Sequence, residues 1–377
     1  MRNMVLKGLA LAVAGALLAA GAVQAAPASS AVARARAAIA ESRRASPTPA
    51  LSVAVVRGGE VVWAEAQGLA DLEQDVRATP ATRFRLGSVS KVVTATLAAR
   101  LAQQGVLDLD APISRYLPDL PAHHRATTLR QLLGHQGGVR HYADKDFAPT
   151  QPGGTIDQRA YASTADALAI FIDDPLIAPP GTRYAYSTFS YTLASAVMEA
   201  AAKRPFLDLV EDELARPLKL SSLKGDQSIP LMPNRTRFYD PAPQGAPAGG
   251  FVNAPAVNVA YKWAGGGFIA TPSDIARLGY ALIRPGYLDA ATHRMVFTNL
   301  ATADGKPTLV GLGWRVDKDR QGRTRWHHAG AIDGGRAVVV IYPDLDLSVA
   351  FMTNLSQTPG EVLIPAEAIA DAFAGKP

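Results

Sequence analysis

The stretch GSVSKVVTATLAARLA, residues 87–102, places a serine and a lysine three positions apart at the start of a run that favours a helix. Residues three apart on a helix share one face, with Cβ atoms about 5–6 Å apart. The amine of Lys91 can then reach the hydroxyl of Ser88, and the N-terminus of the helix offers N–H groups and a positive dipole to an oxyanion. The stretch therefore predicts a nucleophilic serine and its base in the first turn of a helix.

The spacing alone is not decisive, because a second pair, Ser221 and Lys224, has it too. Short motifs must be judged by their context. Ser221 follows PLKL and precedes Gly225 and Asp226, a loop-like sequence with no helix to hold the geometry. An ordinary helix-capping role is the simple alternative for Ser88. We choose Ser88 and Lys91 as the candidate pair.

A lysine base makes a chemical demand on the rest of the chain. The pKa of a free lysine is about 10.4, so the amine is neutral at neutral pH only if it is desolvated or lies beside another cation. A serine nucleophile also needs an oxyanion hole and a third polar group. The remaining sequence is expected to supply them.

Two further motifs answer that demand. Tyr186-Ser187-Thr188 lies between a Pro-Gly turn and a helix-like run, and His328-Ala329-Gly330 ends an alternating, strand-like run. The order S-x-x-K, Y-S-T, H-x-G resembles the serine β-lactamase and penicillin-binding-protein superfamily. The resemblance covers roughly residues 35–357. It is nearest to the class C-like branch, which holds esterases, D-aminopeptidases and D-alanyl-D-alanine carboxypeptidases, and to mitochondrial serine β-lactamase-like proteins.

The resemblance implies a role for each matching position. Ser88 is the acylated nucleophile, Lys91 its proton acceptor, and Tyr186 the residue that carries protons to the leaving group and to the deacylating water. Whether Lys91 or Tyr186 is the acylation base stays open. The substrate-binding residues that it implies are Thr188, His328, Gly330 and Ala331, the last through an oxyanion N–H beside that of Ser88. A decoy of the third motif, His135-Gln136-Gly137, is rejected because it precedes the tyrosine motif.

Two departures from the family pattern bear on the substrate. Thr188 stands where many relatives have Asn, and His328 where β-lactamases commonly have Lys. The hydroxyl of threonine is shorter and has fewer hydrogen-bond donors than the side-chain amide of asparagine. Histidine is also a weaker positive charge than lysine at neutral pH. We therefore expect activated esters to be hydrolysed readily and β-lactams poorly, with amide and D-amino-acid peptide substrates remaining open.

The distribution of strand-like and helix-like runs predicts the fold class. Two β-rich runs flank Gly58-Gly59, a pair suited to a tight hairpin turn, and three more strand-like runs lie near the C-terminus. Helical spacing dominates the middle. We expect an α+β, β-lactamase/transpeptidase-like fold, with an antiparallel sheet flanked by helices in residues 26–110 plus 263–377 and a mainly helical lobe in residues 111–262.

The N-terminus has the pattern of an export signal. Arg2 and Lys7 precede an apolar run, and Val23-Gln24-Ala25 fits a small-x-small cleavage site. The run of about 15 residues is short for a membrane span of roughly 20. We expect residues 1–25 to be a signal peptide, with a mature chain in the periplasm or secreted and no stable membrane anchor. An uncleaved anchor is the alternative.

Composition excludes several classes of function. The chain has no cysteine and a formal net charge of +5, without the basic blocks and interleaved aromatic residues that suggest nucleic acid. The histidine pairs at 123–124 and 327–328 lack the helical spacing of zinc enzymes, so no metal or other cofactor is expected. The expected partner is a small-molecule or peptide substrate, including peptidoglycan-related ones. The rival is a catalytically idle, penicillin-binding-like sensor or assembly module.

Overall fold

The computed structural model describes residues 25–150, 154–243, 250–356 and 362–375. The proposed signal peptide, residues 1–25, lies outside them except for Ala25, which begins the first helix. The helices are α1 (Ala25–Ala45), α2 (Ser90–Gln103), α3 (Leu129–Leu133), α4 (Thr164–Leu168), α5 (Phe189–Ala202), α6 (Phe206–Val210), α7 (Trp263–Gly266), α8 (Pro272–Ala281), α9 (Ala290–Phe297) and α10 (Leu363–Phe373). No helix in these ranges is long and apolar enough to cross a membrane.

The strands form one large antiparallel sheet and two small ones. The large sheet has the order β3-β2-β1-β12-β11-β10-β9, and the small ones have the orders β4-β8-β5 and β6-β7. The strands are β1 (Ala50–Arg57), β2 (Glu60–Asp71), β3 (Val76–Arg77), β4 (Phe84–Arg85), β5 (Lys224–Gly225), β6 (Tyr239–Pro241), β7 (Phe251–Asn253), β8 (Phe268–Ala270), β9 (Arg315–Lys318), β10 (Thr324–Ile332), β11 (Gly335–Tyr342) and β12 (Leu347–Thr353).

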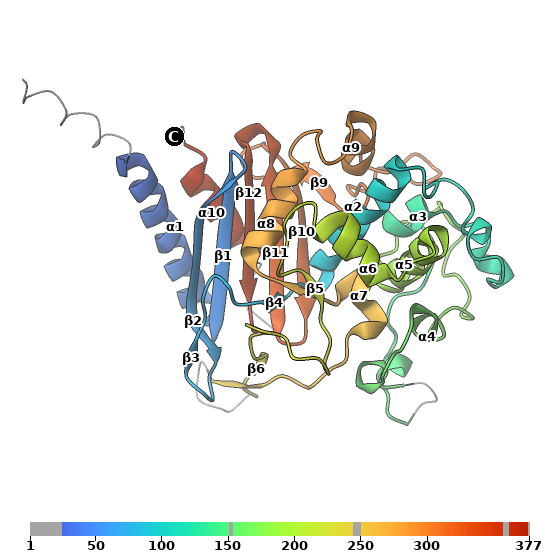
Figure 1. Cartoon of the computed structure of the whole chain (residues 1–377), viewed down its shortest axis with the longest axis horizontal. Helices are drawn as coiled ribbons and strands as arrows, with labels where there is room; N and C mark the ends of the chain where they lie inside the picture. Colours follow the sequence, from blue (N-terminus) through green and yellow to red (C-terminus); the bar gives the residue numbers. More distant parts are fainter. Residues whose placement is uncertain (1–24, 151–153, 244–249, 357–361, 376–377) are drawn as a thin grey trace, which may run out of the picture.

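The hairpin and the C-terminal strands form where the sequence predicts them. β1 and β2 pair across Gly58 and Gly59, which both have positive φ angles. Strands β10, β11 and β12 pair in succession, and β12 also pairs with β1, so the two ends of the chain meet in the middle of the sheet. The expected α+β architecture, an antiparallel sheet built from both ends of the chain, is confirmed (Figure 1).

Helices cover the large sheet on both faces. The terminal helices α1 and α10 pack together on one face, where Ile39 and Ile369 join the inward residues of the central strands. Helix α8 crosses the other face over β1, β11 and β12. It begins at Pro272, and the side chain of Thr271 caps it by accepting from the N–H of Asp274. This two-sided burial holds the sheet rigid behind the candidate site.

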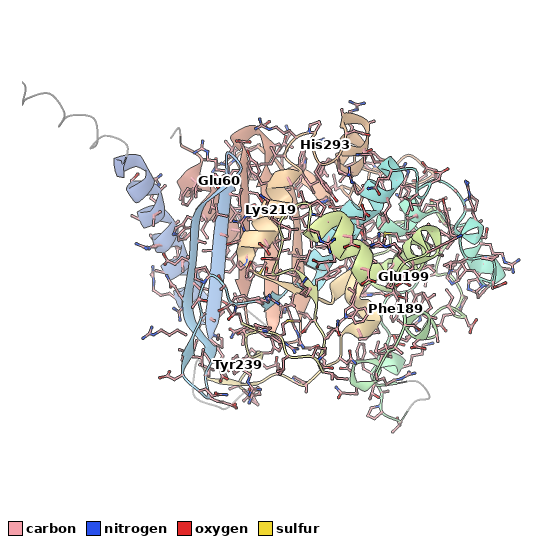
Figure 2. The ribbon with its side chains drawn as sticks, in the orientation of Figure 1. Glu60, Phe189, Glu199, Lys219, Tyr239 and His293 are labelled. Carbon is pink, nitrogen blue, oxygen red and sulfur yellow. The ribbon has the colours of Figure 1, made fainter. Side chains whose placement is uncertain are left out.

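The middle of the chain supplies a helical region beside the sheet. It holds α3, α4, α5 and α6, the last continued by a π-helical turn over Glu211–Ala215. Figure 2 shows Phe189 and Glu199 of α5 in this region. Strand β5 comes from the same stretch yet pairs with β8, so the region is joined to the rest by a short sheet as well as by helix packing. The domain boundaries at 110 and 262 remain a prediction.

Candidate active site

Ser88 lies in a tight turn at the junction of the two regions. Gly87–Val89 form a 3₁₀ turn, and α2 begins directly after it at Ser90. Ser88 is therefore one turn earlier than expected, before the α-helix and not within it. The turn requires φ of +49° at Gly87, a conformation that glycine adopts without strain. The expected proximity still results, because Nζ of Lys91 lies 3.2 Å from Oγ of Ser88.

Lys91 is fully buried and is held by polar atoms that carry no formal charge. Its Nζ donates to the carbonyl oxygen of Gly265 at 2.5 Å and to Oγ1 of Thr188 at 3.2 Å. No carboxylate of the described ranges forms an ion pair with it. Burial lowers the pKa of Lys91 well below its usual value. This environment favours the neutral amine that the sequence analysis requires of a base.

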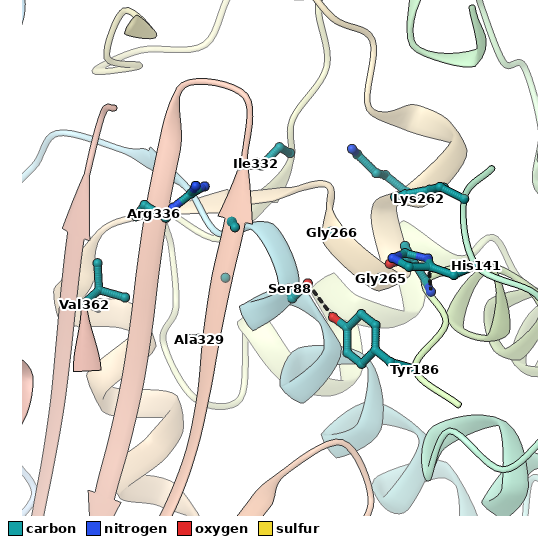
Figure 3. A pocket seen from close by; sticks show the side chains of 14 residues that line it. Ser88, His141, Tyr186, Lys262, Gly265, Gly266, Ala329, Ile332, Arg336 and Val362 are labelled. Carbon is teal, nitrogen blue, oxygen red and sulfur yellow. Dashed lines mark hydrogen bonds between the residues drawn. The ribbon is translucent and has the colours of Figure 1, made fainter. Parts of the chain in front are cut away.

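Tyr186 completes a three-residue cluster. Its phenol oxygen donates to Oγ of Ser88 at 2.6 Å, as the dashed line in Figure 3 marks. Burial raises the pKa of Tyr186 above 10, although the hydrogen bond with Ser88 acts in the opposite direction. The phenol therefore keeps its proton at neutral pH. Ser88 thus lies between an amine that favours the neutral form and a phenol that holds a proton.

The strand motif comes against the serine turn because two glycines allow it. A Cβ on Gly330 of β10 would stand 1.9 Å from the carbonyl oxygen of Leu86 and 2.8 Å from the backbone nitrogen of Ser88. A Cβ on Gly87 would stand 2.7 Å from the backbone nitrogen of Ala331. All three distances are shorter than van der Waals contact. The two backbones can approach this closely only where neither residue has a side chain.

The register of β10 decides where the N–H of Ala331 points. Ile332 and Gly335 flank the two-residue turn and form the first hydrogen-bonded pair with β11, so Ala331 and Arg336 form a pair without ladder hydrogen bonds. The N–H of Ala331 then faces the other edge of β10, which β9 covers only as far as His327. This is the edge against Gly87 and Ser88, as an oxyanion role for Ala331 requires.

His328 differs from the expectation. Its side chain is buried, and its Nδ1 lies 2.7 Å from the carbonyl oxygen of Ala329. Burial lowers the pKa of His328 to about 3, so the ring is neutral at neutral pH. Ala329, Gly330 and Ala331 line the cavity, but His328 does not. His328 therefore supplies neither a positive charge nor a wall to the cavity.

The rejected serine–lysine pair is not a site. Lys224 of β5 forms an ion pair with Glu211 at 2.5 Å, and Ser221 is exposed. The rejected histidine triplet has a different outcome. His135 lies directly beside Tyr186, with ring centroids 4.4 Å apart, although the triplet is not the strand motif. Sequence reasoning missed this neighbour because it tested His135 only for one motif.

The cluster opens into a cavity of about 480 Å³, a volume typical of small-molecule sites. Its lining includes predicted residues (Ser88, Tyr186, Thr188, Gly330 and Ala331) and unpredicted ones (His141, Tyr142, Lys262, Gly265, Gly266, Ala329, Ile332, Arg336 and Val362). Figure 3 shows the amine of Lys262 pointing into the open space of this cavity. Lys262 belongs to none of the sequence motifs, so the sequence analysis did not identify it.

Comparison with known proteins places these features in a family context. A family model described as Beta-lactamase matches residues 35–374. The chain is 26% identical over 388 residues to the mitochondrial serine beta-lactamase-like protein LACTB of Mus musculus, covering 78% of this chain and 70% of that protein. It is 27% identical over 382 residues to the human protein of the same name, covering 78% and 69%.

Solved structures show the same fold. EstCE1, described as a hydrolase with promiscuous acyltransferase activity, superposes with a TM-score of 0.75 at 23% identity, covering 93% of this chain and all of that one. A D-stereospecific amidohydrolase from Streptomyces sp. gives a TM-score of 0.73 at 25% identity, covering 89% and 97%. These likenesses confirm the expected β-lactamase/transpeptidase-like fold.

Proposed function

The chain belongs to the beta-lactamase family, and on that premise we propose that it is a serine hydrolase that forms an acyl-enzyme on Ser88. One observation carries the proposal. Oγ of Ser88 lies 3.2 Å from the amine of Lys91 and 2.6 Å from the phenol of Tyr186, at the wall of a substrate-sized cavity. An idle binding module has no need of a desolvated lysine beside a serine.

The surroundings of Lys91 support a role as the acylation base. A neutral amine has two N–H groups and one lone pair. The carbonyl of Gly265 and the hydroxyl of Thr188 account for the two N–H groups, which leaves the lone pair for Ser88. Tyr186 is a poorer base in the ground state, because its raised pKa keeps the phenol protonated.

The proposed reaction begins as Oγ of Ser88 attacks the substrate carbonyl and its proton passes to Nζ of Lys91. The N–H groups of Ser88 and Ala331 stabilise the oxyanion. The phenol of Tyr186 gives its proton to the leaving group and is reprotonated from Lys91, which restores both residues. Water then attacks the acyl-enzyme and gives a proton to the same pair of residues. The bond between Oγ of Ser88 and the acyl group breaks, that proton passes to Oγ, and the acid product leaves.

The cavity favours substrates that carry a negative charge. His328 and His141 are neutral at neutral pH, since burial lowers their pKa values to about 3 and about 4. Lys262 lies above the rings of Tyr142 and Tyr261, and in the described ranges its ammonium has no hydrogen bond or ion pair. A desolvated ammonium without a partner is a receptor for a carboxylate on the substrate.

The preferred substrate is proposed to be an ester rather than a β-lactam. Thr188 uses its hydroxyl to accept from Lys91, so it is less available to hold an amide than a longer asparagine would be. Esters have better leaving groups and need less help at the departing atom. Amides and D-amino-acid peptides are the next candidates, because one relative in structure is described as a D-stereospecific amidohydrolase.

The test is a panel of substrates with and without the nucleophile. Purified protein is assayed on p-nitrophenyl butyrate, nitrocefin and a D-amino-acid p-nitroanilide, with Ser88→Ala as the control, and is labelled with a fluorophosphonate probe. Turnover of at least one substrate and labelling that Ser88→Ala abolishes support the proposal. Absence of both would instead favour the idle binding module.

We also propose that the protein is exported through residues 1–25. The sequence pattern of a basic start, a short apolar run and a small-x-small site supports this. The LACTB relatives are described as mitochondrial, so the destination is a matter for experiment. N-terminal sequencing of the protein from its native host is expected to find Ala26 or a near neighbour first. An intact Met1 would contradict export by cleavage.

A further inference from the structure

His135 lies outside the cavity lining, behind the ring of Tyr186. It follows α3, is only 2% exposed, and has a φ angle of +59°. The imidazole packs against Tyr186 with ring centroids 4.4 Å apart and against Tyr191 at 5.3 Å. A non-glycine residue in the left-handed region is uncommon and costs about 1 kcal/mol or more, so the contacts that it makes must hold it there.

Two hydrogen bonds tie His135 to the residues on either side of Tyr186. The N–H of Ala185 donates to the carbonyl oxygen of His135 at 2.7 Å. The N–H of Ser187 donates to Nδ1 of the same residue at 3.2 Å. One residue therefore holds the backbone before and after Tyr186 while its ring packs against the phenol ring.

These bonds determine the state of the imidazole. A backbone N–H can only donate, so Nδ1 carries no proton and the neutral ring has its proton on Nε2. The groups that face the ring are Lys91, His328, Arg315 and His141, together with the phenols of Tyr184, Tyr186 and Tyr191, and none of these is a carboxylate. Burial lowers the pKa of His135 well below its usual value.

His141 makes a similar contact one residue later. Its Nδ1 accepts from the N–H of Thr188 at 3.3 Å, and its ring meets the edge of Tyr186 at 5.5 Å. It differs from His135 in lining the cavity, where it can touch a substrate. His135 is thus the one of the two whose effect on turnover must pass through Tyr186.

We infer that His135 is a positioning residue for Tyr186, holding the phenol oxygen within 2.6 Å of Ser88 through the pair of bonds to Ala185 and Ser187. The inference rests on the proposed serine hydrolase activity. Proton delivery depends on near-ideal geometry, and a displacement of about 1 Å costs about 100-fold in rate. Loss of the Nδ1 acceptor leaves the N–H of Ser187 unsatisfied in a buried position, so the segment that carries Tyr186 must shift.

Two substitutions separate the acceptor from the ring. His135→Phe keeps a planar ring and the strained φ angle but removes the acceptor. His135→Asn keeps a side-chain acceptor, and asparagine tolerates a positive φ angle. His124→Phe is the matched control, because His124 is equally buried in the same region and bonds only to the carbonyl of Ile172. Thermal melts identify any variant that has not folded.

The measurement is kcat and KM on p-nitrophenyl butyrate in the wild-type and Tyr186→Phe backgrounds. His135→Phe is expected to lower kcat at least tenfold with KM within twofold, and His135→Asn to restore more than half of the loss in log kcat. His124→Phe is expected to leave kcat within twofold. In the Tyr186→Phe background, His135→Phe is expected to have no further effect, as a residue acting through the phenol requires.

An equal loss in both backgrounds would overturn the inference, since His135 would then act on the fold at large. A second readout needs no activity. In the ¹⁵N spectrum of the wild-type protein, assigned by difference from His135→Asn, Nδ1 of His135 is expected to be unprotonated and unchanged from pH 5 to 8. A ring that titrates in that interval would also overturn the inference. Failure of the proposed function is seen separately, as ester turnover that Ser88→Ala leaves intact.

Discussion

Tyr186 donates a hydrogen bond of 2.6 Å to Ser88, although the two residues stand 98 positions apart in the chain. Ser88 comes from the turn before α2, and Tyr186 from the segment before α5. The contact therefore exists only when the helical region is docked on the sheet region.

The first prediction concerns the nucleophile. Ser88→Ala is expected to lower kcat on p-nitrophenyl butyrate by about 10⁴-fold or more, because no other hydroxyl in the described part of the chain is hydrogen-bonded to both Lys91 and Tyr186. Its melting temperature is expected to stay close to that of the wild type. Ser221→Ala is the matched control and is expected to leave kcat unchanged. Full activity in Ser88→Ala together with loss of activity in Ser221→Ala would refute the choice of Ser88 and Lys91 as the candidate pair.

The second prediction is the pH dependence that Lys91 imposes. The amine is a base only when neutral, so kcat/KM rises with pH through the pKa of Lys91 and is lost below it. Burial lowers that pKa well below 10.5, so substantial activity is expected at neutral pH. Lys91→Met is expected to lower kcat/KM about 10³-fold. A wild-type profile that rises only near pH 10 would show that Lys91 remains charged in the free enzyme.

The third prediction concerns Thr188. Thr188→Asn replaces a hydroxyl that accepts from Lys91 with a longer amide that can reach a substrate carbonyl. The ratio of kcat/KM for nitrocefin to that for p-nitrophenyl butyrate is expected to rise about tenfold. Thr188→Val, which has neither group, is the control and is expected to slow both substrates. Rapid nitrocefin turnover by the wild type would contradict the preference for esters.

The fourth prediction concerns the charge of the substrate. The wild type is expected to prefer mono-p-nitrophenyl glutarate, which carries a carboxylate, over neutral p-nitrophenyl valerate by about tenfold. Burial lowers the pKa of Lys262 to about 8, so its ammonium is charged below that pH and neutral above it. The preference is therefore present below about pH 8 and is lost as the pH rises through it.

Two variants control this test. Lys262→Met is expected to abolish the preference for the anionic ester at every pH and to spare the neutral ester. Lys306→Met changes the net charge by the same amount at an exposed position and is expected to keep the preference. An anionic preference that survives in Lys262→Met would assign the charge to another residue, with Arg336 the next to be tested.

The fifth prediction concerns the contact between the strand and the serine turn. In Gly330→Ala the new methyl group would stand 1.9 Å from the carbonyl oxygen of Leu86, so the turn must move away from β10. The distance between the oxyanion N–H groups then changes, and kcat is expected to fall at least 100-fold. Gly286→Ala is the control, because nothing lies within 4 Å of its Cβ position. Retention of full activity in Gly330→Ala would contradict the close approach.

The sequence predicted the parts of the site that lie within short motifs. The three-residue spacing predicted that Lys91 lies beside Ser88, and the order of the motifs predicted that Tyr186 joins them. The structure has both contacts with Ser88. The predicted antiparallel sheet followed from runs whose periodicity is local. Prediction failed where the partner of a site residue is a backbone atom, because no pattern of side chains marks it. The carbonyl of Gly265, which holds Lys91, comes from a backbone atom in a distant segment.

His328 and Lys262 show a second limit. The strand motif identified His328 correctly as a strand residue, yet its side chain turns back to the carbonyl of Ala329 and is buried. Lys262 lines the cavity instead, from a segment with no periodic pattern. Which side chain faces the cavity depends on how a loop packs against the edge of a strand. The periodicity of apolar residues in a single sequence indicates helices and strands, but it does not indicate that packing.

The pairing of the first long strand with the last has a consequence for how the protein is made. Val53 of β1 lies opposite Phe351 of β12, in the middle of the sheet. A ribosome that adds about 5–20 residues per second needs about 15–60 seconds to travel between them. During that interval β1 lacks its central neighbour, and its apolar side chains have no finished core to enter. The pairing that joins the two halves of the sheet is therefore made only when synthesis is nearly complete or has ended.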